Sequence, residues 1–383
     1  MKTTHTTASA KQKKIAVICR TIGLEYDDRI RKQCIALAER SEIKIFVLFA
    51  DNRSESGTTS YGIPYTSFEL TSKNRLPGGR FLLLKAIEFY LKVKPHLKEF
   101  DTVWCHEEYC FLFPLLSYKG RSIWDLHELP QKFIRFPMRL AFSLIERRTK
   151  TIIHANEERI DYLRRVGLIH KGPEKHKTLH NYPDETFVTL AKSGYRDPKF
   201  TEWLDNRSYV YLQGLTTSDR FPYNTISSIL DTTNHAAVVI GNIDDSEALG
   251  RLKEEYGPTL NERIYFAGMV KQLDIGPYLS GAAFSMVFYN TDDPNNRYCE
   301  ANRFYQAISL GVPVITGSNE SMANIVNQNK LGVSIRSDGR DKDEIKAGIK
   351  RLLDGYDLFK SNCERSRESY IWKDALLLRE WYE

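Results

Sequence analysis

The sequence lacks several motifs that would place it in a familiar class. It has no GxGxxG fingerprint and no GxxxxGK[ST] motif, so neither a dinucleotide site nor a P-loop is predicted. No uncharged apolar run approaches the roughly 18 residues needed to cross a bilayer. Its six cysteines form no CxxC pair, which argues against zinc ribbons and redox motifs and favours reduced cytosolic thiols. Dehydrogenases, P-loop NTPases and membrane-spanning proteins are therefore disfavoured.

Length and charge suit a globular protein of two domains. A chain of 383 residues exceeds the size at which a single core keeps growing, so two domains of roughly 150 to 200 residues are expected. The formal charge of +6 is small for a chain with 27% charged residues, and without a basic motif it does not indicate nucleic-acid binding. It does favour a partner that carries phosphate. The N-terminus, MKTTHTTASAKQKK, has no apolar core and is expected to be a polar tail rather than a secretory signal.

Strand and helix patterns alternate along the chain. An apolar strand at 13–18 is followed by a loop and by a helix from about 28 to 40 with one apolar face. A second series begins with a strand at 209–213 and continues through strands at 236–241 and 263–270. This alternation predicts an α/β protein with two Rossmann-like domains.

Two predicted strands in the first half end in histidine and carboxylate residues. DTVWCH ends in His106, followed by Glu107, and SIWDLHE carries Asp125 and His127. The C-terminal ends of parallel strands carry the chemistry in such sheets, so these residues are candidates for catalysis. The ordinary pKa of histidine, near 6.5, would let His106 exchange protons around neutral pH. A metal site is the alternative, but no HExxH helix and no third ligand at zinc spacing is present, so none is predicted.

Residues 297–317, RYCEANRFYQAISLGVPVITG, pass from a polar run into a predicted helix at 303–310 and a buried strand. Glu300, Asn302, Arg303 and Gln306 precede or lie on this helix. An anionic ligand is favoured near a helix N-terminus, so these residues are candidates for binding one. On periodicity alone, an ordinary helix–strand unit with a solvated face is the favoured explanation of the segment.

The run NRFYQAISLGVPVITG resembles the donor-site signature of retaining glycosyltransferases of family 4, which have the GT-B fold. HNYPDE resembles the family's N-x-P element, and the two histidine strand ends resemble its H-x-H-[DE] and D-x-H-E segments. Asp28 and Arg29 loosely match its opening motif, although a helix cap and a solvated arginine explain them equally.

Two positions depart from the family pattern. Gln306 stands where the second glutamate usually stands, which excludes an ionised carboxylate there. The loop GLTTSDRFPYNT resembles the family's diphosphate loop through Arg220, but Thr225 replaces the expected lysine. Lys271, directly after the strand at 263–270, is the first candidate for the missing cation.

The resemblance implies two Rossmann-like domains facing a central cleft, with a C-terminal helix that returns to the first domain. The expected parts are a disordered polar tail at 1–12, an acceptor-binding domain at 13–185, a linker at 186–207, a nucleotide-sugar-binding domain at 208–360 and the returning helix at 361–383.

The implied activity is transfer of a hexose, with retention, from a nucleotide-sugar to a glycan or polyprenyl-linked acceptor in cell-surface polysaccharide assembly. Neither a metal nor a cofactor is expected, and no nucleic acid. The catalytic candidates are His106, Glu107 and His127, and the donor-binding candidates are Arg220, Lys271, Glu300, Asn302, Arg303 and Gln306.

Two basic segments that contain many aromatic and aliphatic residues, at 80–98 and 130–150, suit an anionic membrane surface, although packed helices with a solvated basic edge are the alternative. We therefore expect a cytoplasmic protein that associates peripherally with the inner membrane face. Two other functions stay open. A nucleotide-sugar epimerase of the same fold would need no acceptor, and a non-catalytic carbohydrate-binding or scaffold protein would tolerate Gln306 and Thr225.

Overall fold

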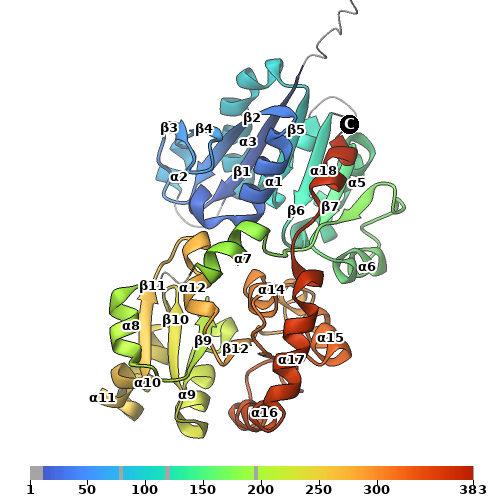
Figure 1. The fold of residues 1–383 in the computed structure, drawn as a ribbon. Helices are drawn as coiled ribbons and strands as arrows, with labels where there is room; N and C mark the ends of the chain where they lie inside the picture. The colour runs from blue at the N-terminus through green and yellow to red at the C-terminus, as the bar shows by residue number, and fades with distance from the viewer. Residues whose placement is uncertain (1–11, 77–80, 117–120, 194–196, 383) are drawn as a thin grey trace, which may run out of the picture. The chain divides into compact units, whose positions relative to one another are not determined.

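The computed structural model describes residues 12–76, 81–116, 121–193 and 197–382 (Figure 1). The chain forms two compact units. The first comprises Met1–His154, Leu163–Lys177 and Asp374–Glu383, and the second comprises Ala155–Tyr162 and Thr178–Lys373. Of the expected polar tail, residues 1–11 lie outside the described ranges.

The first unit is built on an eight-stranded sheet with the order β3-β4-β2-β1-β5-β6-β7-β8. Strands β1, β2, β5, β6 and β7 pair in parallel, and β3 is antiparallel to β4. The chain order reverses between β1 and β5, and ligands of open α/β sheets bind outside the strand ends at such a point. The strands are β1 (Lys13–Thr21), β2 (Ser41–Phe49), β3 (Ser56–Thr58), β4 (Pro64–Ser67), β5 (Thr102–His106), β6 (Ser122–Leu126), β7 (Thr151–His154) and β8 (His176–Thr178).

Continuous apolar runs explain the central strands of this sheet. Ile15, Ala16, Val17 and Ile18 of β1 are all buried, as expected for a parallel strand covered on both faces. The α-helices are α1 (Asp28–Ala38), α2 (Thr71–Arg75), α3 (Leu82–Val93), α4 (Leu112–Leu116), α5 (Met138–Arg148), α6 (Glu157–Arg165), whose residues up to Tyr162 are assigned to the second unit, and α18 (Ala375–Tyr382). Short 3-10 turns include η3 (Glu108–Cys110) and η4 (Gln131–Ile134).

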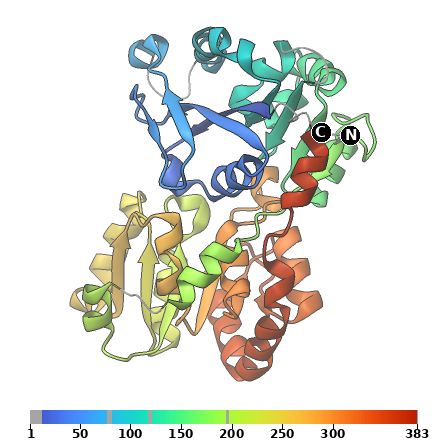
Figure 2. The ribbon, with the colours of Figure 1, turned by 45° about the horizontal axis from the view of Figure 1, so that its top comes forward.

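The last helix belongs to the first unit, as the resemblance implies. Residues 361–373 of the segment expected to return, however, belong to the second unit. Arg379 of α18 forms hydrogen bonds with the Ala36 carbonyl and the Glu39 carboxylate, at the end of α1. Figure 2 shows α18, in red, beside the helices of this unit.

The second unit has a six-stranded, parallel sheet in the order β11-β10-β9-β12-β13-β14. The order reverses between β9 and β12. Alternate residues of β9 face opposite cores: Tyr209 and Tyr211 pack in one, Val210 and Leu212 in the other. The strands are β9 (Tyr209–Gln213), β10 (Ala236–Ile240), β11 (Ile264–Gly268), β12 (Phe284–Val287), β13 (Val314–Thr316) and β14 (Gly332–Ser334).

Helices pack on this sheet through the two cores. They are α7 (Glu185–Lys192), α8 (Pro198–Leu204), α9 (Pro222–Thr232), α10 (Ser246–Tyr256), α11 (Pro258–Arg263), α12 (Gly276–Leu279), α13 (Pro294–Arg297), α14 (Asn302–Ser309), α15 (Glu320–Asn329), α16 (Lys342–Asp354) and α17 (Tyr356–Ser366). The predicted α/β architecture of two Rossmann-like domains is confirmed.

The stretch 186–207, expected as a linker, holds most of α7 and the whole of α8. Phe187 and Phe200, one from each helix, are fully buried in a core of the second unit, which also contains Tyr209. Each helix is short, and its aromatic residue is buried by neighbours that are distant in sequence. Within the described ranges, no helix is long and apolar enough to cross a membrane.

Candidate functional site

Two arginines meet at the point where the strand order of the second unit reverses. Arg220 ends the 3-10 turn η5 (Ser218–Arg220) in the loop after β9, and its Nη1 donates to the Gly214 carbonyl oxygen at 3.1 Å. Arg303 lies in the first turn of α14. The guanidinium carbons of Arg220 and Arg303 lie 4.7 and 4.6 Å from the centre of the Tyr289 ring, just beyond β12. One aromatic ring therefore supports two cations.

Gly214 makes room for both guanidinium groups. It directly follows β9 and has a φ of +66°. A Cβ at this position would lie 2.8 Å from Nη1 of Arg303 and 3.2 Å from Nη1 of Arg220. Any other residue would strain the backbone and displace the arginines, so glycine is required by both conformation and space.

The arginine pair has unused hydrogen-bonding capacity. Nε and Nη2 of Arg303 and Nε of Arg220 are buried without a hydrogen-bond partner among the described residues. Burial, reinforced by the charge of Arg220, lowers the pKa of Arg303. Buried cations without an acceptor are unfavourable, and an anion with several oxygens would relieve that cost.

The start of α14 adds to this site. Its N-cap residue, Ala301, offers no side-chain hydrogen bond, and the next residue, Asn302, is half-buried. Both amide atoms of Gln306 are buried without a partner in the described structure. An uncapped helix start favours an anion, and a free amide can donate to one hydroxyl and accept from another.

Glu300 is held by a histidine that the sequence did not single out. Nδ1 of His180 lies 2.9 Å from Oε2 of Glu300, and Nδ2 of Asn181 donates to the Glu300 carbonyl oxygen at 3.2 Å. These partners lie in the HNYPDE segment, whose N-x-P element was the only available signal. Glu300 is therefore fixed in orientation just before α14.

Lys271 follows a different strand of the sheet from the one that leads to Arg220. It is exposed, in the loop after the edge strand β11, and β10 separates β11 from β9. Neighbouring strands are about 4.8 Å apart, so the lysine starts roughly 10 Å along the sheet from β9. Arg303, rather than Lys271, shares the Tyr289 ring with Arg220.

The first unit brings its two candidate histidines into direct contact. His106, at the end of β5, is fully buried, and its Nδ1 lies 2.8 Å from Nε2 of His127, just beyond β6. Oδ2 of Asp125 lies 3.8 Å from the first of these nitrogens and 3.7 Å from the second. Nε2 of His106 is buried without a partner in the described chain.

Asp125 is fixed by α1. Arg29 donates to its carboxylate from Nε at 3.0 Å and from Nη2 at 2.7 Å, and Gln33 donates from Nε2 at 2.6 Å. Arg29 is therefore buried and paired with Asp125 rather than solvated, and the part of Gln33 was not anticipated. Burial alone would raise the pKa of Asp125, but Arg29 and the two imidazoles hold it well below its usual range.

The protonation state of His106 differs from the expectation. Burial lowers its pKa to about 4, an effect that Asp125 opposes and Arg29 reinforces. The imidazole is therefore neutral at pH 7. Its ordinary pKa near 6.5 was a poor guide because that value assumes a solvated ring.

His106, Asp125 and His127 also present ligand atoms within 4.8 Å of one another, a set that could hold a metal ion. The sequence did not predict this set, because Asp125 lies within β6 and not after its end. However, both oxygens of Asp125 already accept bonds from Arg29 or Gln33. The guanidinium charge opposes a second cation beside the same carboxylate, so the trio suits proton sharing better than metal binding.

Glu107 has an unusual backbone conformation beside this trio. Its φ is +65° and its ψ is 164°, a region that residues other than glycine rarely occupy. Its N–H donates to the Asp125 carbonyl at 2.8 Å, and its own carbonyl accepts from Nε1 of Trp124 at 2.9 Å. Both bonds come from β6 and hold the strained residue in place. Burial, with smaller contributions from Asp27 and Glu128, raises the pKa of Glu107 to about 8.

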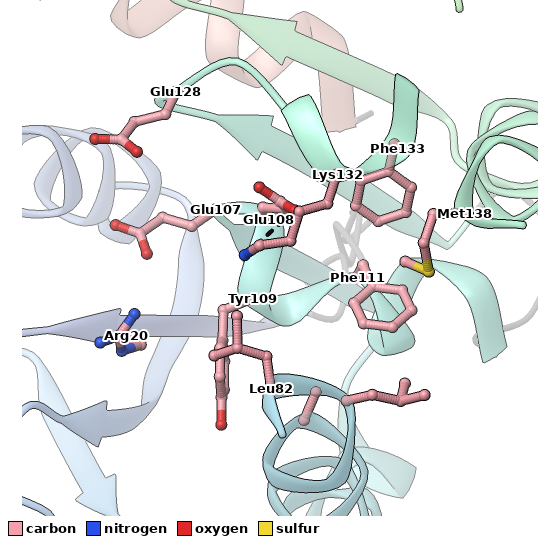
Figure 3. A pocket seen from close by; sticks show the side chains of 12 residues that line it. Arg20, Leu82, Glu107, Glu108, Tyr109, Phe111, Glu128, Lys132, Phe133 and Met138 are labelled. Atoms are coloured by element: carbon pink, nitrogen blue, oxygen red, sulfur yellow. Dashed lines mark ion pairs between the residues drawn. The ribbon is translucent and has the colours of Figure 1, made fainter. Parts of the chain in front are cut away.

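The Glu107 side chain lines a cavity of about 240 Å³ in the first unit (Figure 3). Polar side chains gather on one side of it and apolar side chains on the other. The lining residues include Arg20, Leu82, Glu108, Tyr109, Phe111, Glu128, Lys132, Phe133 and Met138. The cavity could therefore receive a ligand that has both polar and apolar parts.

No family profile and no curated protein sequence matches the chain significantly. Solved structures do. Sucrose-phosphate synthase from Thermosynechococcus elongatus superposes with a TM-score of 0.73 at 16% identity, covering 97% of this chain and 98% of that one. HepE from Anabaena, solved with UDP, gives 0.69 at 14% identity over 96% and 97%. WaaG, a glycosyltransferase involved in lipopolysaccharide biosynthesis, gives 0.65 at 14% identity over 96% and 97%. The chain therefore has the two-domain GT-B fold of these proteins.

Proposed function

We propose that the protein is a glycosyltransferase that moves a hexose from a nucleotide-sugar to a hydroxyl acceptor with retention. The observation that carries the proposal is the pair of arginines, Arg220 and Arg303, with buried N–H groups unpartnered within the described chain, beside the uncapped start of α14. A nucleotide diphosphate has the charge and the oxygens that this arrangement lacks. The same ligand class is bound by HepE, which was solved with UDP and with UDP-glucose.

Each part of the second-unit site has a role in this proposal. The arginines bind the diphosphate and stabilise the charge that develops on it as it leaves. Gln306 hydrogen-bonds a ribose hydroxyl, and Glu300, held by His180, accepts from a second hydroxyl. In the first unit, His106 orients the acceptor hydroxyl and Glu107 lines the acceptor cavity. Retention is supported by the sequence resemblance.

A panel of nucleotide-sugars tests the proposal. Thermal stabilisation of the protein by one or more members, followed by calorimetry, would identify the donor base and sugar. Transfer to an added acceptor would then distinguish a transferase from an epimerase, which would isomerise the free nucleotide-sugar. Absence of nucleotide binding across the panel would favour a non-catalytic carbohydrate-binding or scaffold protein and refute the proposal.

We predict that transfer is independent of divalent metal. The arginines supply the positive charge, and the acidic pair that precedes Pro294 is already engaged: Asp292 pairs with Arg340 at 2.9 Å, and Asp293 caps α13. Activity should be unchanged after treatment with EDTA. Activity that disappears in chelator and returns with magnesium or manganese would contradict this expectation.

The surface of the first unit supports association with an anionic membrane. Exposed apolar side chains lie on α3 and around α5, among exposed basic residues that include Lys92, Lys94, Arg135 and Arg139, whereas Lys85 is buried and Arg80 lies outside the described residues. The exposed apolar residues are Phe81, Leu83, Leu84, Ile87, Leu91, Phe136, Leu140 and Leu144. We propose that this surface places the enzyme at the inner membrane face during polysaccharide assembly.

Vesicle sedimentation tests this surface. We expect binding to vesicles that contain phosphatidylglycerol and weaker binding as salt rises, because exposed charges are screened. Arg135→Glu with Arg139→Glu should reduce binding, since each basic residue contributes about 1 kcal/mol near such a surface. Lys253→Glu with Lys350→Glu, an equal charge change on exposed helices of the second unit, is the control. Equal partition to neutral and anionic vesicles would contradict the prediction.

A further inference from the structure

The cavity of the first unit has two chemically different ends (Figure 3). Arg20, Glu107 and Glu128 lie on the polar side. Phe111, Phe133 and Met138 lie on the apolar side, with Leu82 and Leu83 of α3 completing the lining. Lys132 pairs with Glu108 at 3.6 Å between the two ends.

The size of the cavity limits what it can hold. At about 240 Å³ it is smaller than the roughly 300 to 1,000 Å³ of sites that enclose a whole drug-sized ligand. It therefore takes a fragment of a larger molecule. A sugar ring alone would place hydroxyls against phenyl groups and a thioether, which accept hydrogen bonds weakly at best, and this is unfavourable.

The apolar side continues to the protein surface. Leu83 lines the cavity and is 55% exposed, and Leu84, the next residue of α3, is also exposed. A chain of carbon atoms that enters the cavity can thus remain in contact with apolar side chains outside it. On the polar side, the exposed Arg20 lines the cavity and lies over the Tyr109 ring, at 5.4 Å from its centre.

We infer that the acceptor is an amphiphile, in which a sugar carries an apolar group and the protein itself binds that group between Phe111, Phe133 and Met138. The polar head meets Arg20, Glu107 and Glu128. The apolar group can be a lipid chain or an aryl aglycone, since both have the required surface. This inference rests on the proposed transferase function, and it names the acceptor class for that function.

Binding of simple glucosides tests the inference without any donor. The probes are methyl, octyl and phenyl β-D-glucopyranoside, each below any micelle concentration, with the full chain monitored by tryptophan fluorescence and calorimetry. Octyl or phenyl glucoside should bind at least tenfold more tightly than methyl glucoside, because burial of two methylene groups already has about that effect. A preference for octyl indicates a lipid acceptor, and a preference for phenyl indicates an aryl one.

Two variants locate the binding. Met138→Gln and Leu83→Gln should each remove most of the preference for the apolar glucoside, whereas Met269→Gln, on a methionine 53% exposed in the second unit, should not. Leu83 lies at the exposed rim of the cavity, so Leu83→Gln should fold and can test the inference if Met138→Gln does not fold. Equal binding of all three glucosides, or an unchanged preference in Leu83→Gln, would overturn the inference. Nucleotide binding in the same preparation would still support the transferase, so the two failures are distinguishable.

Discussion

Replacement of His106 by alanine is expected to reduce turnover by roughly 10²-fold or more while leaving nucleotide affinity nearly unchanged. Nε2 of His106 is a buried ring nitrogen without a partner in the described chain, at the C-terminal end of a central strand. The other ring nitrogen is fixed by His127. We expect a substrate hydroxyl to be the missing partner of Nε2, and the arginine pair that is proposed to bind the donor belongs to the other unit. Steady-state kinetics and nucleotide calorimetry on the same variant measure the two effects.

The control for this experiment must be chosen with care. His127 is unsuitable, because its removal would also strip His106 of its 2.8 Å partner. His170 is exposed in the same unit, and His170→Ala should leave turnover unchanged. Normal turnover in a folded His106→Ala variant would show that His106 does not act on the acceptor. A loss of nucleotide affinity as large as the loss of turnover would show the same.

The pKa values predict the pH dependence. Because the pKa of His106 falls to about 4 on folding, the unfolded chain binds a proton between pH 6.5 and pH 4 that the folded chain does not. This contribution to stability is present above pH 6.5 and is lost as the pH falls towards 4. The free energy of unfolding, measured in urea, should fall less between pH 7 and pH 5 in His106→Gln than in the wild type. Glu107, with a pKa raised to about 8, stays protonated at pH 7 and ionises above pH 8.

Alanine at either Arg220 or Arg303 should weaken donor binding by about 1.5 to 3 kcal/mol, the scale of a charge-assisted hydrogen bond, or roughly 10-fold to 150-fold in affinity. Replacement of Arg303 should also have an opposite effect on a second quantity, the stability of the nucleotide-free protein. Its buried guanidinium faces the like charge of Arg220 and has unpartnered N–H groups within the described structure, so Arg303→Met should stabilise the nucleotide-free protein. A melting temperature that rises without nucleotide but responds less to nucleotide would be the signature of a site kept for binding.

Lys271 and Lys253 provide graded controls. Lys271→Ala should have a smaller effect than Arg303→Ala because Lys271 is exposed beyond an edge strand, and Lys253→Ala should have none. Unchanged nucleotide affinity in Arg220→Ala would remove the diphosphate assignment. A larger loss in Lys271→Ala than in Arg303→Ala would assign the second cation to the lysine.

Local pattern alone determined the architecture of this protein. Apolar runs such as Ile15 to Ile18 and the strand at 209–213 are buried on both faces. A strand buried on both faces needs consecutive apolar residues, and such a run can be recognised in the sequence. The same holds for the positions of His106 and His127, because residues that end parallel strands meet at one edge of the sheet. The linker expected at 186–207 is different, since α7 and α8 are short and their burial depends on neighbours distant in sequence.

The tertiary structure decided which side chains act together and in what charge state. Arg29 meets Asp125 across 96 positions of sequence, and Arg303 shares the Tyr289 ring with Arg220, a loop residue of another strand. No spacing rule connects such partners. The low pKa of His106 and the raised pKa of Glu107 likewise follow from burial and from charges on several elements. Electrostatic energies sum over neighbours in space, so folding had to bring those neighbours together before the site could be defined.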